Sequence, residues 1–166
     1  MAQKEDPNTK VVASNRKAFH NYSIEEKIEA GLILKGTEVK SLREGRVNLR
    51  EAYATVAQGK AVLHNCHIGE YSHGNIMNHE PLRTRGLLLH KKQIQKLTGQ
   101  VQQKGLTIVP LRIYFNTRGI AKIELGLALG KKHYDRRESV KKREAGREME
   151  RAMKTRQKNN DQSLAR

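Results

Sequence analysis

Two long apolar segments near residue 115 constrain the fold of this chain more than any other feature. Residues 106–115 and 120–129 are both rich in Ile, Leu and Val, and Asn116-Thr117-Arg118-Gly119 between them is typical of a tight turn. Two apolar segments joined by such a turn predict an antiparallel hairpin. Within the second segment Ile123, Leu125, Leu127 and Leu129 alternate with other residues, so they are expected to share one face.

Further strands and helices are predicted around this hairpin. Ile24, Ile28, Ala30 and Leu32 share one parity, with Glu25, Lys27 and Glu29 on the other, which predicts a half-buried strand with Glu26 as an exception. Thr37 is expected to cap a short helix over 38–44 that ends at Gly45. The remaining expectations are a hairpin of strands 53–57 and 61–68, a long loop over 69–86 and a helix over 90–103.

Short strands separated by turns, with one or two helices, favour a mainly β fold. A small closed β-barrel is the preferred architecture, because closure removes the exposed edges of an open sheet. An OB-like barrel fits the length of 166 residues, ahead of an SH3-like barrel or an α+β sheet.

Charge divides the chain into a body and a tail. Residues 131–166 hold 13 Lys and Arg but 6 Asp and Glu, with few large apolar side chains, so this segment is expected to be disordered when alone. The expected organisation is a flexible leader over 1–12, a folded body over 13–130 and a basic tail over 131–166 that is helical only against a partner.

The net charge of +16 favours a polyanionic partner such as nucleic acid. The single cysteine, Cys66, fits a reducing compartment, and no apolar run is long enough for a membrane span or a signal peptide. We therefore expect a cytoplasmic protein that binds nucleic acid and does not bind a membrane.

Catalytic and metal-binding signals are weak. His64, Cys66 and His67 form the densest group of metal-ligating residue types, but no second ligand pair has the spacing of a structural zinc site. Strand residues with one buried face explain them better than a zinc hydrolase does. The sequence thus predicts no enzyme, no metal and no cofactor.

The basic residues occur in short clusters spread over the body: Arg16-Lys17, Arg43 with Arg46, Arg83 with Arg85, and Lys91-Lys92. Their convergence on one surface would position a phosphate backbone. The start of the tail adds His133 and Tyr134, flat groups that stack on bases, among cations. Farther along, Ala145, Met149, Ala152 and Met153 recur at helical spacing.

Several blocks resemble one known family. They are Asn15-Arg16-Lys17-Ala18, residues 24–31, Gly36-Thr37-Glu38-Val39-Lys40-Ser41-Leu42-Arg43-Glu44-Gly45, Asn78-His79-Glu80-Pro81 with Arg83-Thr84-Arg85, Leu87-Leu88-Leu89-His90, Val109-Pro110-Leu111, and Gly130-Lys131-Lys132 followed by Tyr134-Asp135-Arg136-Arg137. In this order, over about nine tenths of the chain, they resemble the SsrA-binding protein (SmpB) family.

The resemblance implies a six-stranded antiparallel OB-like barrel with two or three short helices and a tail that is unstructured off the ribosome. It implies a non-enzymatic protein that binds the tRNA-like domain of transfer-messenger RNA. With elongation factor Tu and GTP, the family delivers this RNA to stalled ribosomes for trans-translation. The tail would occupy the decoding centre of the small subunit and the empty mRNA channel, and we expect a monomer when free.

The resemblance also implies site residues. Family residues implicated in RNA binding match Asn15, Glu29 and Leu88, and a tail element matches Asp135-Arg136-Arg137, with Arg136 in place of the usual Lys. Gly86 replaces a frequent Lys, and a distal Trp of some relatives is absent near Ala145. The candidate RNA-binding set is Asn15, Arg16, Lys17, Glu29, Glu38, Lys40, Arg43, Arg83, Arg85 and Leu88. The candidate ribosome-binding set is Lys131, Lys132, His133, Tyr134, Asp135, Arg136, Arg137, Met149 and Met153.

A different class of function fits the composition equally well. A generic basic OB-fold protein, either ribosome-associated or binding single-stranded RNA, would carry the same charge. It would not account for the specific sequence blocks.

Overall fold

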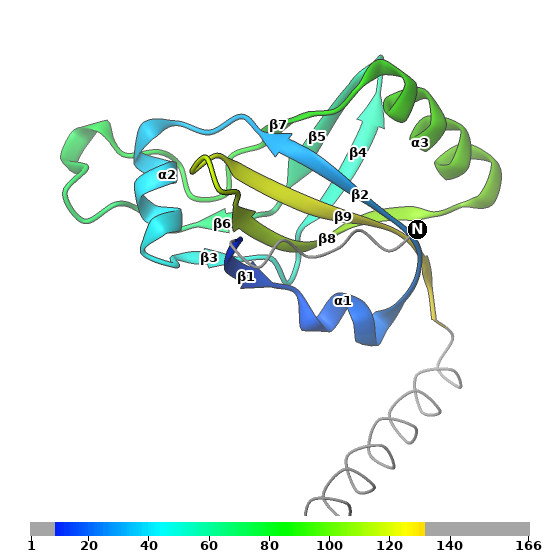
Figure 1. The fold of residues 1–166 in the computed structure, drawn as a ribbon, viewed down its shortest axis with the longest axis horizontal. Coiled ribbons are helices and arrows are strands. Elements are labelled where there is room, and N and C mark those ends of the chain that lie inside the picture. Colours follow the sequence, from blue (N-terminus) through cyan, green and yellow to red (C-terminus); the bar gives the residue numbers. More distant parts are fainter. Residues whose placement is uncertain (1–8, 132–166) are drawn as a thin grey trace, which may run out of the picture. The chain divides into compact units, whose positions relative to one another are not determined.

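The computed structural model describes residues 9–131, and its compact unit ends at Gly130. The elements are, in chain order, β1 (Lys10–Ser14), α1 (Arg16–Asn21), β2 (Tyr22–Leu32), α2 (Gly36–Arg43), β3 (Val47–Asn48), β4 (Tyr53–Ala57), β5 (Lys60–His64), β6 (His67–Ile68), the 3-10 helix η1 (Asn75–Met77), β7 (Arg85–Leu88), α3 (Lys91–Lys104), β8 (Thr107–Phe115) and β9 (Ala121–Gly130) (Figure 1). The prediction of a mainly β fold with a few helices is confirmed.

An antiparallel sheet organises this part of the chain. Its hydrogen-bonded order is β1-β8-β4-β5-β7-β2-β9, and β9 pairs in addition with β8. The pairing order therefore runs from β8 through β4, β5, β7, β2 and β9 and returns to β8. β1 also pairs with β8, at residues 112–115. The joint between β4 and β8 is the narrowest, with Ala54 opposite Ile108 as its one paired position.

The predicted hairpin is confirmed as β8 and β9, which pair from Thr107 opposite Ala128 to Phe115 opposite Ala121. Its inward side chains supply much of the core: Ile108, Ile113, Ile123, Leu125 and Leu127 are at most 2% exposed. Leu129 was predicted on the same face but is 48% exposed, because it lies at the end of β9 beyond the core.

A bulge changes the predicted face of β2. Ile24 lies opposite Ala128 and Glu26 opposite Leu127, so Glu25 is an extra residue in the strand. Beyond the bulge, Ile28 and Ala30 belong to the main core, as predicted. Before it, Ile24 packs instead against a second cluster that includes Ala18 of α1 and Leu111 of β8. The prediction that Ile24 shares the core face was therefore wrong.

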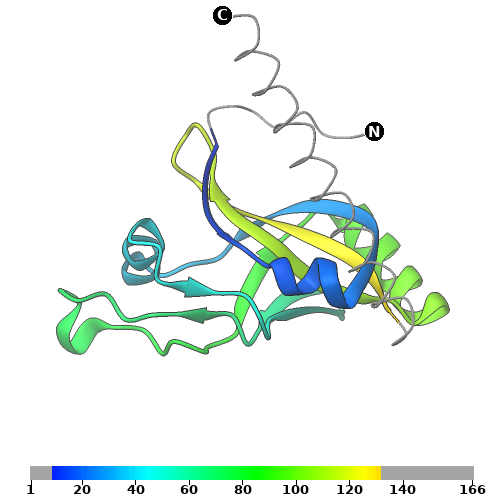
Figure 2. The ribbon, with the colours of Figure 1, turned by 90° about the horizontal axis from the view of Figure 1, so that it is seen from below.

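The helices lie at different places around the sheet. In both views α3 lies at one end of the body, and α2 lies at the other end together with the loop that carries η1 (Figures 1 and 2). α3 begins after His90 and ends at Gly105, close to the predicted 90–103, and it buries Ile94 and Leu97 as the helical spacing predicted.

α2 begins earlier than predicted and has a different cap. Lys35 is the N-cap, and the carboxylate of Glu38 accepts a 2.6 Å hydrogen bond from its backbone N–H. Thr37 is not the cap, since its hydroxyl is hydrogen-bonded to the ring of buried His79 at 3.0 Å. The predicted stop is confirmed, because Gly45 adopts φ of +76° just after the helix.

Three segment boundaries also differ from the prediction. β1 includes residues 10–12, which the sequence assigns to a leader, because Lys10 and Val11 pair with β8. The predicted strand 61–68 is divided, since Asn65 has a positive φ of 52° and β6 pairs with β3 instead of continuing β5. The long loop ends before Arg85, where β7 begins, and contains η1.

Candidate nucleic-acid interface

Glu29 lies at the centre of a polar network on the outer face of the sheet. Its carboxylate accepts a hydrogen bond from the hydroxyl of Tyr114 on β8 and lies 3.1 Å from the ammonium of Lys122 on β9. The pairing register brings these groups together, because Glu29 is opposite Glu124 and Lys122 is opposite Tyr114.

These contacts change the proton affinity of both acids. The hydrogen bond from Tyr114 is the main reason that the pKa of Glu29 is lowered, and Lys122 adds to the effect against partial burial. Burial and the same hydrogen bond raise the pKa of Tyr114. Glu29 is therefore ionised at neutral pH and is held in a defined orientation.

Further ion pairs lie near this network on the same face of the sheet. Arg112 on β8 lies 2.7 Å from the carboxylate of Glu124, and Lys27 on β2 approaches the same carboxylate at 3.7 Å. Lys27 also lies 6.0 Å from the ring centre of Phe19 on α1. The face thus presents cationic side chains held in place by carboxylates, an arrangement suited to phosphate contacts.

Glu29 and Leu88 line the same shallow groove, which runs between β2, β7 and the start of α3 and includes Lys27, His90 and Lys122. Leu88 is 60% exposed although it is apolar. It pairs with Gly31, where an added Cβ would lie only 3.2 Å from the Cβ of Leu88. A glycine at position 31 therefore allows β7 to approach, and the groove combines a carboxylate, cations and an exposed apolar side chain.

A second group of predicted site residues is buried. Glu38 and Arg85 have fully buried side chains, joined at 2.8 Å between Oε1 and Nε, and Arg83 bonds the same carboxylate. Burial alone would raise the pKa of Glu38, but the hydrogen bonds from Arg83 and the Lys35 backbone and the charge of Arg85 together lower it.

The guanidinium of Arg85 also donates hydrogen bonds to the backbone carbonyls of Cys66, Pro81 and Arg83. The sequence predicts that Glu38 and Arg85 contact RNA, but in this structure both side chains are buried. The network of Glu38 and Arg85 joins α2 to β7 and to the loop before β7. An acidic and a basic residue are needed for this buried ion pair, just as they would be for a contact with RNA.

Asn15 is also buried, at 4% exposure. Its amide donates to the carbonyls of Leu49 and Pro110 at 2.9 and 3.2 Å, and its side-chain oxygen caps α1 by accepting from Ala18 at 3.1 Å. The next two residues, Arg16 and Lys17, begin α1 and are exposed. Asn15 thus holds this basic helix from a buried position.

The other predicted contacts lie elsewhere. Lys40 on α2 lies 5.2 Å from the ring centre of Tyr71, and Arg43 lies 5.8 Å from that of Phe115. The structure therefore brings Glu29 and Leu88 to one groove, whereas Arg16, Lys17, Lys40 and Arg43 do not line that groove. Of the predicted tail residues Lys131 alone is described, and residues 132–137, Met149 and Met153 lie outside the described residues.

Sequence reasoning missed Tyr114, Lys122 and Glu124. A signal existed for two of them, since Lys122 and Glu124 are the charged residues of an otherwise apolar β9. No sequence signal pointed to Tyr114, because it lies 85 positions from Glu29 and only strand pairing brings the two residues together.

The potential zinc ligands have other contacts. His64 stacks on Tyr53 and is hydrogen-bonded to Thr55 at 2.9 Å, and burial raises the pKa of Cys66 to about 11. Across residues 9–131 no group of three or more His, Cys, Asp or Glu side chains is placed to hold a metal ion. None of the helices described there is both long and apolar enough to cross a membrane.

These features define a small, basic, mainly β protein whose outer sheet face carries ordered cations beside a polar and apolar groove. Residues 12–155 match the protein family described as SmpB protein. The chain belongs to the SmpB family.

Relatives extend over nearly the whole sequence. The SsrA-binding protein of Geobacillus kaustophilus is 57% identical over 149 residues, which cover 90% of this chain and 96% of the relative. That of Halalkalibacterium halodurans is 59% identical over 145 residues, 87% of this chain and 94% of the relative. A solved structure described as "tmRNA-SmpB: a journey to the center of the bacterial ribosome" is 53% identical in sequence and superposes with a TM-score of 0.63. The match covers 74% of this chain and 85% of the chain in that structure.

Proposed function

We propose that this protein binds transfer-messenger RNA and acts with it at the ribosome in trans-translation, the rescue of stalled ribosomes and tagging of their nascent peptides. The identity of 57–59% to SsrA-binding proteins along nearly their full length carries the proposal. The solved relative described with tmRNA and the ribosome supports the same partners. The relatives are named for binding and not for catalysis, which agrees with the prediction that this protein is not an enzyme.

The groove of Glu29 and Leu88 is the proposed contact with the tRNA-like domain. Leu88 supplies an apolar surface for a base or ribose, Lys27 and Lys122 supply charge for phosphates, and Glu29 accepts hydrogen bonds from base amino groups. Arg16, Lys17, Lys40, Arg43 and Arg83 are proposed as further phosphate contacts, because they lie at least partly at the surface. Asn15, Glu38 and Arg85 support these contacts from within the body.

The fold proposal is an OB-like barrel. Its support is the pairing order of six strands that returns to β8, with α3 at one end. We also propose that residues 131–166 form a basic tail that enters the decoding centre and the mRNA channel. Elongation factor Tu with GTP would act through the RNA, and the free protein would be a cytoplasmic monomer without a cofactor.

Isolation of the full-length protein from its cells, followed by sequencing of the RNA bound to it, tests the function. One dominant RNA with a tRNA-like end is the expected result. A broad spread of messages would favour the generic single-strand or ribosome-associated alternative, for which charge alone suffices.

A further inference from the structure

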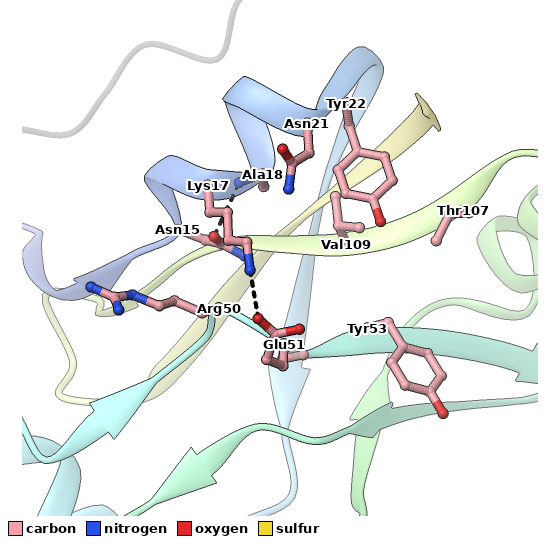
Figure 3. Close-up of a pocket in the computed structure, with 11 residues that line it drawn as sticks. Asn15, Lys17, Ala18, Asn21, Tyr22, Arg50, Glu51, Tyr53, Thr107 and Val109 are labelled. Atoms are coloured by element: carbon pink, nitrogen blue, oxygen red, sulfur yellow. Dashed lines mark hydrogen bonds and ion pairs between the residues drawn. The ribbon is translucent and has the colours of Figure 1, made fainter. Parts of the chain in front are cut away.

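A second site lies beside α1, away from the groove of Glu29 and Leu88. A cavity of about 240 Å³ opens between α1, the segment before β4 and β8. Two of its walls carry aromatic rings, those of Tyr22 and Tyr53, and Thr107 lies between them (Figure 3). The cavity lies beside the pairing of β4 with β8, and the groove lies beside the pairing of β2 with β7. The cavity and the groove share no lining residue.

Tyr53 is held in place by a neighbouring ring. Its ring stacks on the ring of His64 with centroids 5.1 Å apart and an interplanar angle of 18°. His64 is fixed in turn by its hydrogen bond to Thr55. Tyr53 nevertheless remains 40% exposed. A large flat side chain that is both ordered and accessible is a surface on which a nucleobase stacks.

The walls of the cavity are joined by Asn15. Its two amide bonds reach the carbonyl of Leu49, next to Arg50 in the cavity wall, and that of Pro110 on β8, while its oxygen caps α1. Its own backbone N–H donates to Leu111 at 2.7 Å. One buried side chain thus forms hydrogen bonds to all three walls of the cavity.

The mouth of the cavity is cationic. An adjoining depression is lined by Ser14, Arg16, Lys17, Arg50 and Glu51. The ammonium of Lys17 lies 2.6 Å from the carboxylate of Glu51, and both side chains are at least half exposed. An exposed ion pair of this kind is weak, so a phosphate could replace the carboxylate as the partner of Lys17. Glu51 would then be available to accept a hydrogen bond from an N–H group of the base, such as N3–H of uracil.

We propose that this cavity binds one unpaired nucleotide of an RNA, with the base beside Tyr53 and Tyr22 and the phosphate at the mouth between Lys17 and Arg50. The proposal rests on the RNA-binding function proposed above and adds a base-accepting site to it. Rings, a neutral amide from Asn21 and a cationic mouth in one cavity match the three parts of a nucleotide, which a phosphate site alone would not require.

Photocrosslinking of the full-length protein to a hexanucleotide of 4-thiouridine tests this site. Trypsin releases Tyr22 in the peptide 18–27 and Tyr53 in the peptide 51–60, so a base in the cavity predicts crosslinks to these two peptides. The variant Tyr53→Leu should lower crosslinking to 18–27 by roughly 5- to 50-fold, since one stacking contact is lost. Tyr53→Phe, which keeps the ring, should preserve it, and so should Tyr71→Leu in the loop before η1.

An abasic ribose-phosphate hexamer separates base recognition from charge. Wild type should bind it more weakly than hexauridylate, and Tyr53→Leu should remove most of that difference. Crosslinks confined to other peptides, or equal binding of both hexamers, would overturn the proposed cavity site. If wild type still binds the tRNA-like domain in that case, the proposed function stands and only the cavity fails; loss of binding to that domain would instead contradict the function.

Discussion

The hydroxyl of Tyr114 donates a hydrogen bond to the carboxylate of Glu29, although 85 positions separate the two residues. β9 lies between their strands, and its Lys122 completes the contact from the middle. A carboxylate that is bonded from two strands is fixed in orientation, so it presents a defined acceptor to a partner. Glu29 is therefore an oriented hydrogen-bond acceptor, and its role is not limited to adding one negative charge to a basic surface.

The variant Tyr114→Phe should raise the pKa of Glu29 toward the ordinary glutamate value of about 4.3, because its main lowering contact is removed. The carboxyl chemical shift of Glu29, followed by NMR against pH, measures the change. Tyr71→Phe is the control and should leave the titration in place. An unchanged pKa in Tyr114→Phe would mean that Lys122 alone holds the carboxylate.

The variant Glu29→Ala should weaken binding to the tRNA-like domain by roughly 10- to 100-fold, as expected for the loss of a charge-assisted hydrogen bond. Glu25→Ala changes the net charge equally from an exposed position on the same strand. Simple electrostatics predicts tighter binding for both variants, because each makes the protein more basic. Titrations in which the two variants behave alike would remove Glu29 from the interface.

Glu38→Ala should lower the free energy of unfolding by about 3–5 kcal/mol, because it leaves buried Arg85 without its carboxylate. The Glu25→Ala variant should change stability little. Urea unfolding at neutral pH compares the two, and similar losses would contradict a stabilising role of the buried network.

The same carboxylate predicts a dependence on acid. The folded pKa of Glu38 is lowered, so its stabilisation is present above the unfolded value of about 4.3 and is lost as the pH falls through the folded pKa. Unfolding experiments on Glu38→Gln should show a shallower decline over this acidic range than the wild type. Parallel declines would assign acid sensitivity to other carboxylates.

Gly31→Ala should destabilise the protein by about 1 kcal/mol and shift Leu88, because the new Cβ would lie within 3.2 Å of that side chain. Gly36→Ala adds the same atom where nothing lies within 4 Å and is the matched control. The free energy of unfolding and the affinity for the tRNA-like domain should both fall for the first variant. If only stability falls, the position of Leu88 does not matter for RNA binding.

Replacement of Asp135, Arg136 and Arg137 together with Ala tests the proposed tail. This change removes a net charge of only +1, so affinity for isolated transfer-messenger RNA should change little, whereas peptide tagging on stalled ribosomes should fall sharply. Reordering residues 138–158 at fixed composition should impair tagging as well, since it scrambles the helical spacing of Met149 and Met153 in the sequence. Tagging that simply follows RNA affinity would reduce the tail to a charge anchor.

Local patterns predicted the elements well where one signal dominated. The hairpin of β8 and β9 and the helix α3 were predicted within a residue or two, because apolar periodicity and turn residues act over short distances. The face of Ile24 and the division of strand 61–68 were not predicted. The bulge at Glu25 shows only in the pairing with β9, although the exception at Glu26 was its local trace, and the break at Asn65 separates strands that have different partners.

The candidate site shows the same division. The resemblance selected Glu29 and Leu88, and strand pairing brings both to one groove. It selected Asn15, Glu38 and Arg85 as well, but these residues support the structure from within. Residue type alone does not distinguish a charge that faces RNA from one that is neutralised inside the body.

The amino-acid sequence by itself determined that this protein is basic and rich in β-strands, because composition and short-range periodicity require no partner segment. Only the tertiary structure decided which charged groups meet. Glu38 and Arg85 lie 47 positions apart and become a buried ion pair, while Glu29 reaches Tyr114 across β9 and stays accessible. Burial depends on which strands and helices cover a side chain, and that follows from long-range pairing, which no local window of the sequence contains.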